Sequence, residues 1–195
     1  MFILLILTSL IIIGLKKLDL IPVIIFCQAS VIAIICHRMG LEVPLIVLVF
    51  TVKALIIPLL LYYVVKKTIV YDQRPMAFPV AVIVALVAVI FVAAYFFTRQ
   101  ITAGPFAMAA IFTALIGMLL ITSRKTLVGQ LAGFIVLQNG IFAFTSSFCL
   151  KFTFALEMVL AIDVLLSVLI MAYAILTIYK RLGNIDIKTF TTLRG

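Results

Sequence analysis

The amino-acid sequence predicts an all-α, polytopic integral membrane protein with about seven transmembrane helices in one membrane domain, residues 1–195. Three observations support this fold class. Hydrophobic residues make up 67% of the 195 and charged residues 11%, whereas a soluble domain is about half apolar and about a quarter charged. The mean hydropathy is +1.45. Apolar runs of about 20 residues, enough to cross a bilayer, alternate with short charged connections. A soluble enzyme and a disordered chain are both excluded.

The apolar runs between charged residues give seven predicted spans: 2–15, 20–36, 43–65, 76–98, 102–122, 127–149 and 153–179. The first is the shortest. It has no basic segment before it and no small-residue cleavage site after it, so we expect a retained helix and not a signal peptide. Prolines mark the start of the next four spans, where the first turn tolerates a missing N–H: Pro22, Pro44, Pro75, Pro79 and Pro105. The last two spans are bounded by charged residues. Because the connections are short, consecutive helices are expected to be antiparallel neighbours.

The basic residues predict the orientation of the chain. Seven spans would place three bases on one side of the membrane: Arg38, Arg99 and Lys151. They would place eleven on the other: Lys16, Lys17, Lys66, Lys67, Arg74, Arg124, Lys125, Lys180, Arg181, Lys188 and Arg194. This bias predicts an amino terminus outside and a carboxyl terminus in the cytoplasm. The net charge of +9 is thereby explained by orientation and by contact with anionic lipid, and not by nucleic-acid binding.

Lys53 stands out because it lies near the centre of the span 43–65, where a lysine costs about 2.5–3.5 kcal/mol and reaches water poorly. Five residues later, Pro58 lacks an N–H and leaves the carbonyl of Ala54 without its helical partner. A kink beside a buried lysine predicts a hydrated site with a functional role. The alternative is a structural ion pair that only orients helices.

Asp163 lies close to the midpoint of the last span, with Ser167 one turn further along the same face as a possible hydrogen-bond partner. Glu157 is about one turn inside the boundary of the span. The two acids are six residues apart, about 240° around the helix, so they cannot share a face. We therefore expect Asp163 to be the buried protonatable group. Glu157 lines an entry path, or else is a partly solvated acid at the end of the helix.

Gln138, Asn139 and Gly140 lie near the centre of the span 127–149. The side-chain amides of Gln138 and Asn139 can form hydrogen bonds across helices or bind water. Gln28 in the second span belongs to the same polar class, and its expected role is helix packing. Gly129 and Gly133 form a GxxxG pattern that favours close helix packing. The group Lys53, Gln138 and Asp163 at similar depth is typical of an ion or proton path. His37, beside Arg38, is expected at the membrane boundary.

No catalytic or cofactor motif accompanies these residues. The three cysteines have no metal-ligand spacing, there is one histidine, and no nucleophile–base pair or glycine-rich phosphate loop occurs. We expect the chain to carry no cofactor and no metal.

The sequence resembles the hydrogenase-4 component E family, a membrane subunit of formate hydrogenlyase-like and other group 4 [NiFe]-hydrogenase complexes. The segments that carry the resemblance are IFCQASVIAI (25–34), VKALIIPLLLYY (52–63), GFIVLQNG (133–140), LEMVLAIDVLLSVLIM (156–171) and the tail GNIDIKTFTTLRG (183–195). Residues 102–195 are also similar, more weakly, to the K subunit of respiratory complex I and to the C subunit of multisubunit cation/proton antiporters. Two intramembrane glutamates of the K subunit lie along its proton path. Asp163 resembles the second of these, and Gln138 stands near the first, where relatives often have glutamate.

The resemblance implies a non-catalytic membrane-arm subunit of an oxidoreductase complex in a prokaryotic inner membrane, with antiporter-like and hydrophilic partner subunits. Proton or sodium translocation would couple to redox chemistry in those partners. Lys53 and Asp163 would change charge, and Glu157, Gln138 and Asn139 would support a hydrated path. Two alternatives stay open: a structural linker subunit without an ion path, and a small-solute transporter, which would be expected to show broken helices in matching repeats.

Overall fold

The computed structural model describes residues 2–15, 18–40, 43–68, 78–100, 104–148 and 154–182, apart from the side chains of residues 45, 148, 154–157 and 182. These residues form eight α-helices, and the predicted all-α fold is confirmed. The helices are α1 (Phe2–Gly14), α2 (Ile21–Arg38), α3 (Val43–Val49), α4 (Ile57–Thr68), α5 (Val80–Gln100), α6 (Pro105–Ser123), α7 (Leu127–Phe148) and α8 (Phe154–Leu182). A 3₁₀ turn, Leu18–Leu20, leads into α2.

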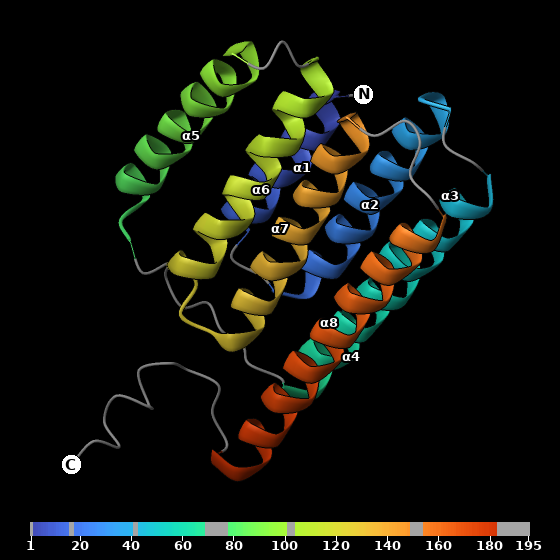
Figure 1. Cartoon of the computed structure of the whole chain (residues 1–195). Helices are drawn as coiled ribbons and strands as arrows, with labels where there is room; N and C mark the ends of the chain where they lie inside the picture. The colour runs from blue at the N-terminus through green and yellow to red at the C-terminus, as the bar shows by residue number, and fades with distance from the viewer. Residues whose placement is uncertain are drawn as a thin grey trace.

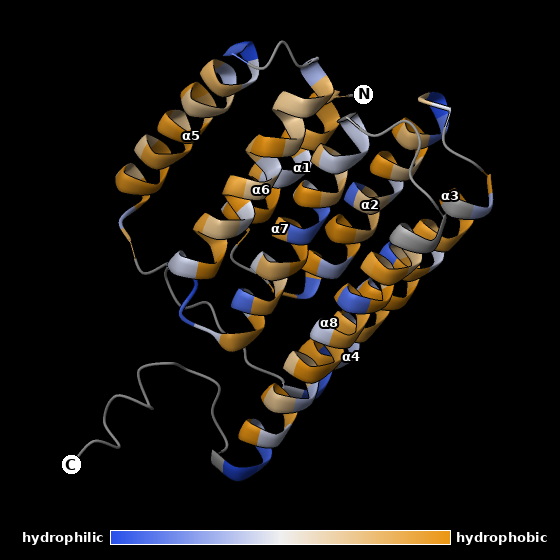
Figure 2. Cartoon of the chain, in the orientation of Figure 1, coloured by the Kyte–Doolittle hydropathy of each residue, from blue (hydrophilic) through white to orange (hydrophobic). Residues whose placement is uncertain are grey.

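Within the described residues, six helical stretches are long and apolar enough to cross a membrane: Leu18–Arg38, Ile46–Thr68, Val80–Gln100, Pro105–Ser123, Leu127–Ser147 and Met158–Arg181. They match six of the seven predicted spans to within a few residues. The seventh, α1, has 13 residues and is about 20 Å long at 1.5 Å per residue, shorter than the bilayer core. The chain is a multi-pass membrane protein, and Figure 2 shows mostly hydrophobic helices with hydrophilic residues at helix ends and at a few positions within helices such as α7 and α8.

The third span is continuous but not uniform. Between α3 and α4 the chain forms a π-helical segment, Phe50–Ile56, in which the N–H of Ile57 donates to the carbonyl of Val52 five residues earlier. Pro58 follows directly and lies in the first turn of α4. The kink predicted from Pro58 takes a different form here: the helix is irregular through widened π-helical turns around Lys53. Such π-helical insertions recur at functional sites.

The helices form a bundle with two exposed flanks (Figure 1). Helices α6 and α7 lie side by side at its centre, with α1 packed on α6 and α2 packed on α1 and α7. Helix α8 packs along α4 and α3, and α5 lies against α6 on the opposite flank. Few residues of α5 and α8 are buried, only 11% and 28% of their most apolar windows. These two helices therefore present the largest apolar surfaces to the surroundings.

The close packing of α6 on α7 depends on three glycines. A Cβ built on Gly117 of α6 would collide with the backbone of Leu137, and one on Gly140 of α7 would collide with the backbone of Ala114. A Cβ on Gly133 would lie 2.8 Å from the backbone nitrogen of Ile121. The close helix approach predicted at Gly133 is confirmed. Gly129, the other half of the GxxxG pattern, instead faces Arg124 and Thr126 in the turn before its own helix.

Candidate functional site

Lys53 lies inside the bundle, as predicted, with 5% of its surface exposed. The π-helical segment directs its side chain at α7. There its ammonium Nζ lies 3.5 Å from the backbone carbonyl oxygen of Gln138 and 4.0 Å from the centre of the Phe142 ring. A carbonyl dipole and an aromatic face both stabilise a cation, the latter by about 0.5–2 kcal/mol. The site is therefore built to hold a charged lysine at mid-helix depth.

A continuous layer of buried polar side chains lies beside this lysine. We call Ser9, Gln28, Thr113 and Asn139 the polar layer. They come from α1, α2, α6 and α7, and at most 2% of each is exposed. The Asn139 amide donates to Gln28 Oε1 over 3.3 Å, and Gln28 Nε2 donates to Ser9 Oγ over 3.0 Å. Ser9 Oγ and Thr113 Oγ1 lie 3.1 Å apart. The polar layer therefore links four helices through side-chain hydrogen bonds.

The two hydroxyl groups of the polar layer can arrange their protons in more than one way. Ser9 Oγ lies 2.8 Å from the carbonyl oxygen of Leu5, and Thr113 Oγ1 lies 2.8 Å from that of Ala109. Each hydroxyl has one proton. Either Ser9 donates to Leu5 and Thr113 donates to Ser9, or Ser9 donates to Thr113 and Thr113 donates to Ala109. Rotation of these two hydroxyl groups reverses the donor–acceptor direction between Ser9 and Thr113 and keeps the hydrogen bond between them.

Gln138 and Asn139 play different roles, although they are neighbours in the sequence. Gln138 contacts Lys53 through its backbone carbonyl, and its side chain is only half-buried. Asn139 is buried and joins the polar layer through its side-chain amide. These two consecutive residues of α7 connect the lysine with the polar layer. Ser9 and Thr113 were missed by sequence reasoning, because single hydroxyl residues are common in membrane helices and often bond their own helix backbone.

We predict that Asn139→Leu lowers the free energy of unfolding by about 1–3 kcal/mol, because Gln28 Oε1 loses its donor inside the bundle. Thermal unfolding in detergent, followed by circular dichroism, measures the loss. The matched control is Thr145→Val on the exposed side of α7, where the hydroxyl bonds only its own helix. The double variant Gln28→Leu/Asn139→Leu should lose less than the sum of the single variants. Additive losses would show that the two amides are not coupled.

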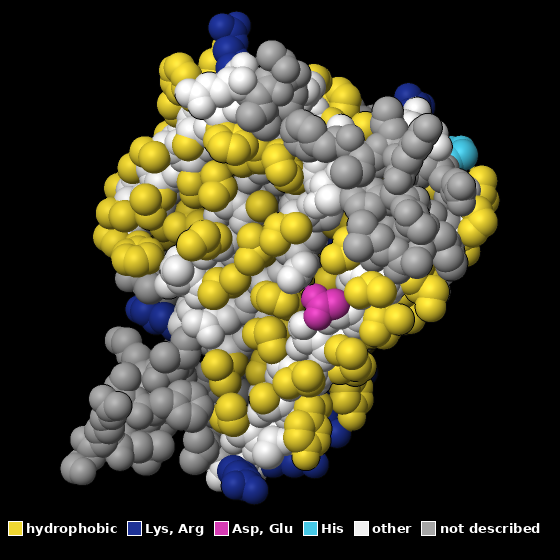
Figure 3. All heavy atoms as spheres, viewed as in Figure 1, with side chains coloured by type: hydrophobic (Ala, Val, Ile, Leu, Met, Phe, Trp, Pro, Cys, Tyr) yellow, Lys and Arg dark blue, Asp and Glu magenta, His cyan; other side chains and the backbone are white. Residues whose placement is uncertain are grey.

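Asp163 lies on the surface of the chain and not in its interior. The expectation of a buried group hydrogen-bonded to Ser167 is wrong: α8 turns Asp163 outward, and no hydrogen bond or ion pair reaches it from the described residues. Figure 3 shows an acidic side chain among hydrophobic ones over this part of the molecule. A carboxylate at mid-helix depth facing hydrocarbon costs about 2.5–3.5 kcal/mol on insertion scales. The side chain of Glu157 lies outside the described residues.

Arg124 has a role that the sequence did not indicate. Its side chain is 8% exposed, and its guanidinium donates to the carbonyl oxygens of Ile12, Ile13 and Leu15 over 3.0, 3.5 and 2.6 Å. Burial lowers the pKa of Arg124 from its ordinary value, but a guanidinium stays charged at neutral pH. Positive charge stabilises the carboxyl end of a helix. Arg124 therefore caps the carboxyl end of α1. It is not one of the solvated loop bases with which it is grouped in the count of charges on the two sides of the membrane.

We predict that Arg124→Met lowers the free energy of unfolding by about 2 kcal/mol, because the last carbonyls of α1 lose a charged donor. The midpoint of thermal unfolding in detergent should fall by about 4–8 °C. The neighbouring base Lys125, which is half-buried, provides the control, and Lys125→Met should shift the midpoint by less than 2 °C. Equal shifts for the two variants would contradict the capping role.

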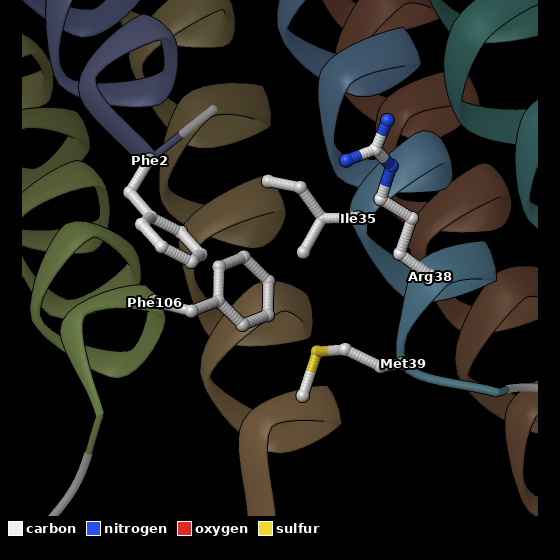
Figure 4. Close-up of a pocket in the computed structure, with 5 residues that line it drawn as sticks. All are labelled: Phe2, Ile35, Arg38, Met39 and Phe106. Carbon is white, nitrogen blue, oxygen red and sulfur yellow. The ribbon is translucent and has the colours of Figure 1, made fainter.

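A separate apolar hollow of about 340 Å³ lies between the ends of α1, α2 and α6. Phe2, Ile35, Met39 and Phe106 line it, together with the stem of Arg38. The centroids of the Phe2 and Phe106 rings lie 6.1 Å apart, and the two rings are tilted by 39° (Figure 4). The described residues of its lining include no acid and no histidine, so they offer this hollow mainly apolar contact.

Within the described residues no cluster of three or more histidine, cysteine or acidic side chains could hold a metal ion. Comparison of the chain with protein-family models, with curated proteins and with solved structures gave no match. The site is thus described by its geometry: one buried lysine, a polar layer across four helices, and one carboxylate on the outer face of α8.

Proposed function

We propose that the chain is a membrane-arm subunit of a hydrogenase-type, complex I-related assembly, in which it contributes to proton or sodium translocation coupled to redox chemistry in partner subunits. The observation that carries this proposal is Lys53. A charged side chain buried at mid-helix depth, in a π-helical segment and next to a hydrogen-bonded polar layer, is typical of an ion path. The segments around Lys53 and Asp163 resemble the hydrogenase-4 component E family, and this resemblance is our reason for proposing a complex of the hydrogenase type.

In this proposal Lys53 is the charge-switching group, and the backbone carbonyl of Gln138 and the ring of Phe142 stabilise its protonated form. Asn139 and the rest of the polar layer supply hydrogen bonds that rearrange by hydroxyl rotation. They do not titrate, so ions or water must carry charge along them. Asp163 would contribute from the seam between this chain and a neighbouring subunit, and Glu157 would support the hydrated path. The redox cofactors would reside in the partners.

The proposed orientation keeps the amino terminus outside and the carboxyl terminus in the cytoplasm of a prokaryotic inner membrane. Removing the capping residue Arg124 from the count leaves ten bases on the cytoplasmic side, eleven minus one, against three on the other. That excess still satisfies the positive-inside rule. The bases at positions 16, 17, 74, 151, 188 and 194 lie outside the described residues.

The experiment that tests the kind of complex is purification of the tagged full chain from its native membrane in mild detergent. We expect antiporter-like membrane subunits and iron–sulfur or hydrogenase subunits to copurify in fixed stoichiometry. Recovery of the chain as a lone monomer that moves a small solute in vesicles would contradict the proposal and favour a carrier. A complex of this composition that assembles without any effect of site substitutions on ion translocation would favour a purely structural linker.

A further inference from the structure

The outer face of α8 has a regular pattern of exposed residues. Val159, Asp163, Leu166, Ile170 and Tyr173 follow one another at intervals of four, three, four and three residues, and we call them the α8 stripe. The four hydrophobic members are between 53% and 73% exposed, and Asp163 is exposed with them. Alternation of three and four residues keeps side chains on one side of a helix, the arrangement that packs against another helix. The stripe is therefore shaped for a helical partner.

Helix α5 provides a comparison within the same molecule. Its exposed side chains are hydrophobic over most of its length, including Val84, Val89 and Phe96, and its one charged residue, Arg99, lies in the last turn. Lipid tails can cover such an apolar surface without leaving a charged group unpaired. The α8 stripe differs because a carboxylate interrupts it at the tenth residue of the 29-residue helix, and lipid tails offer that carboxylate no hydrogen bond and no counter-charge.

We propose that the α8 stripe docks one transmembrane helix of a partner protein that carries a lysine or arginine at the depth of Asp163. Charge complementarity selects this occupant. A second copy of the chain packed symmetrically through the same stripe would bring Asp163 against Asp163, and like charges at the contact oppose that arrangement. The inference deepens the proposed function by naming the surface through which the assembly forms, and it depends on that proposal only in requiring a membrane partner.

The test places a photo-crosslinking amino acid at Leu166 or at Ile170 of the full chain in its native membrane, with Val84 of α5 as the matched control position. Mass spectrometry of the crosslinked peptides identifies the neighbour. We expect both α8 probes to label one transmembrane segment that contains a lysine or arginine, and the α5 probe to label lipid. Lipid labelling from α8, labelling of a second copy of this chain, or a partner segment without a basic residue would each overturn the proposal.

Asp163→Asn tests the charge itself. It should lower the α8 crosslinking yield about tenfold, whereas Asp163→Glu should retain most of it. Because no described residue of the chain bonds Asp163, the thermal midpoint of the isolated Asp163→Asn chain should equal that of the wild type. Crosslinking that is unchanged in Asp163→Asn overturns the docking role, and if ion translocation is lost in that variant, Asp163 belongs to the ion path instead. If Asp163→Asn loses the crosslink but the complex that still forms translocates ions normally, the result supports docking and contradicts a role of Asp163 in the ion path.

Discussion

Gly140→Leu is expected to lower the free energy of unfolding by about 3 kcal/mol, the upper end of the range for overpacking a tight interior. At Gly140 the added Cβ would collide with the backbone of Ala114 in α6. Backbone atoms cannot rotate away, so α6 and α7 must separate along the centre of the bundle. For a chain of this size the midpoint of thermal unfolding in detergent should fall by about 6–12 °C.

The control for this prediction is Gly14→Ala. No atom lies within 4 Å of a Cβ at Gly14, and alanine in place of glycine in a helix typically stabilises it by about 0.5–1 kcal/mol. Gly140→Ala should already be destabilising. Equal behaviour of Gly14→Ala and Gly140→Ala would show that the helices tolerate separation and that the glycine contact does not determine the packing.

Hydropathy predicted where the helices lie but not how they are rotated. The spans follow from length and charge, because lipid requires about 20 apolar residues per crossing. In a soluble protein the polar face of a helix reveals its buried face, but in a membrane bundle both faces are apolar. This is why the sequence did not reveal that Asp163, expected in the interior, faces outward. The same reason explains why Gly117 and Gly140 were not identified as contact residues.

The features of the site that could be predicted are those determined by the residue itself or by its neighbours in the sequence. Lys53 had to avoid hydrocarbon, so its burial was foreseeable, and Pro58 required an irregular helix nearby. The roles of Arg124 and Ser9 depend on residues more than 100 positions away, such as Ile12 for the guanidinium and Thr113 for the serine. No local pattern indicates such contacts. Only the packing of α1 on α6 brings them together.

Lys53→Met is the change that bears most directly on function. It removes the buried ammonium that Gln138 and Phe142 stabilise and keeps a side chain of similar length. If Lys53 changes charge during translocation, its loss should raise the barrier by about 1.4 kcal/mol or more, a tenfold slower ion transfer. Lys53→Arg should assemble and retain only part of the transfer, since arginine stays charged.

Lys67→Met is the matched control, because Lys67 is an exposed lysine of the same span whose ammonium lies 2.7 Å from Tyr63 Oη. The decisive measurement is ion translocation per redox turnover in sealed vesicles that contain the purified assembly, compared between Lys53→Met and Lys67→Met. The proposed ion path predicts a normal complex with at least tenfold less translocation for Lys53→Met and wild-type translocation for Lys67→Met. A fully assembled Lys53→Met complex that translocates at the wild-type rate would contradict it.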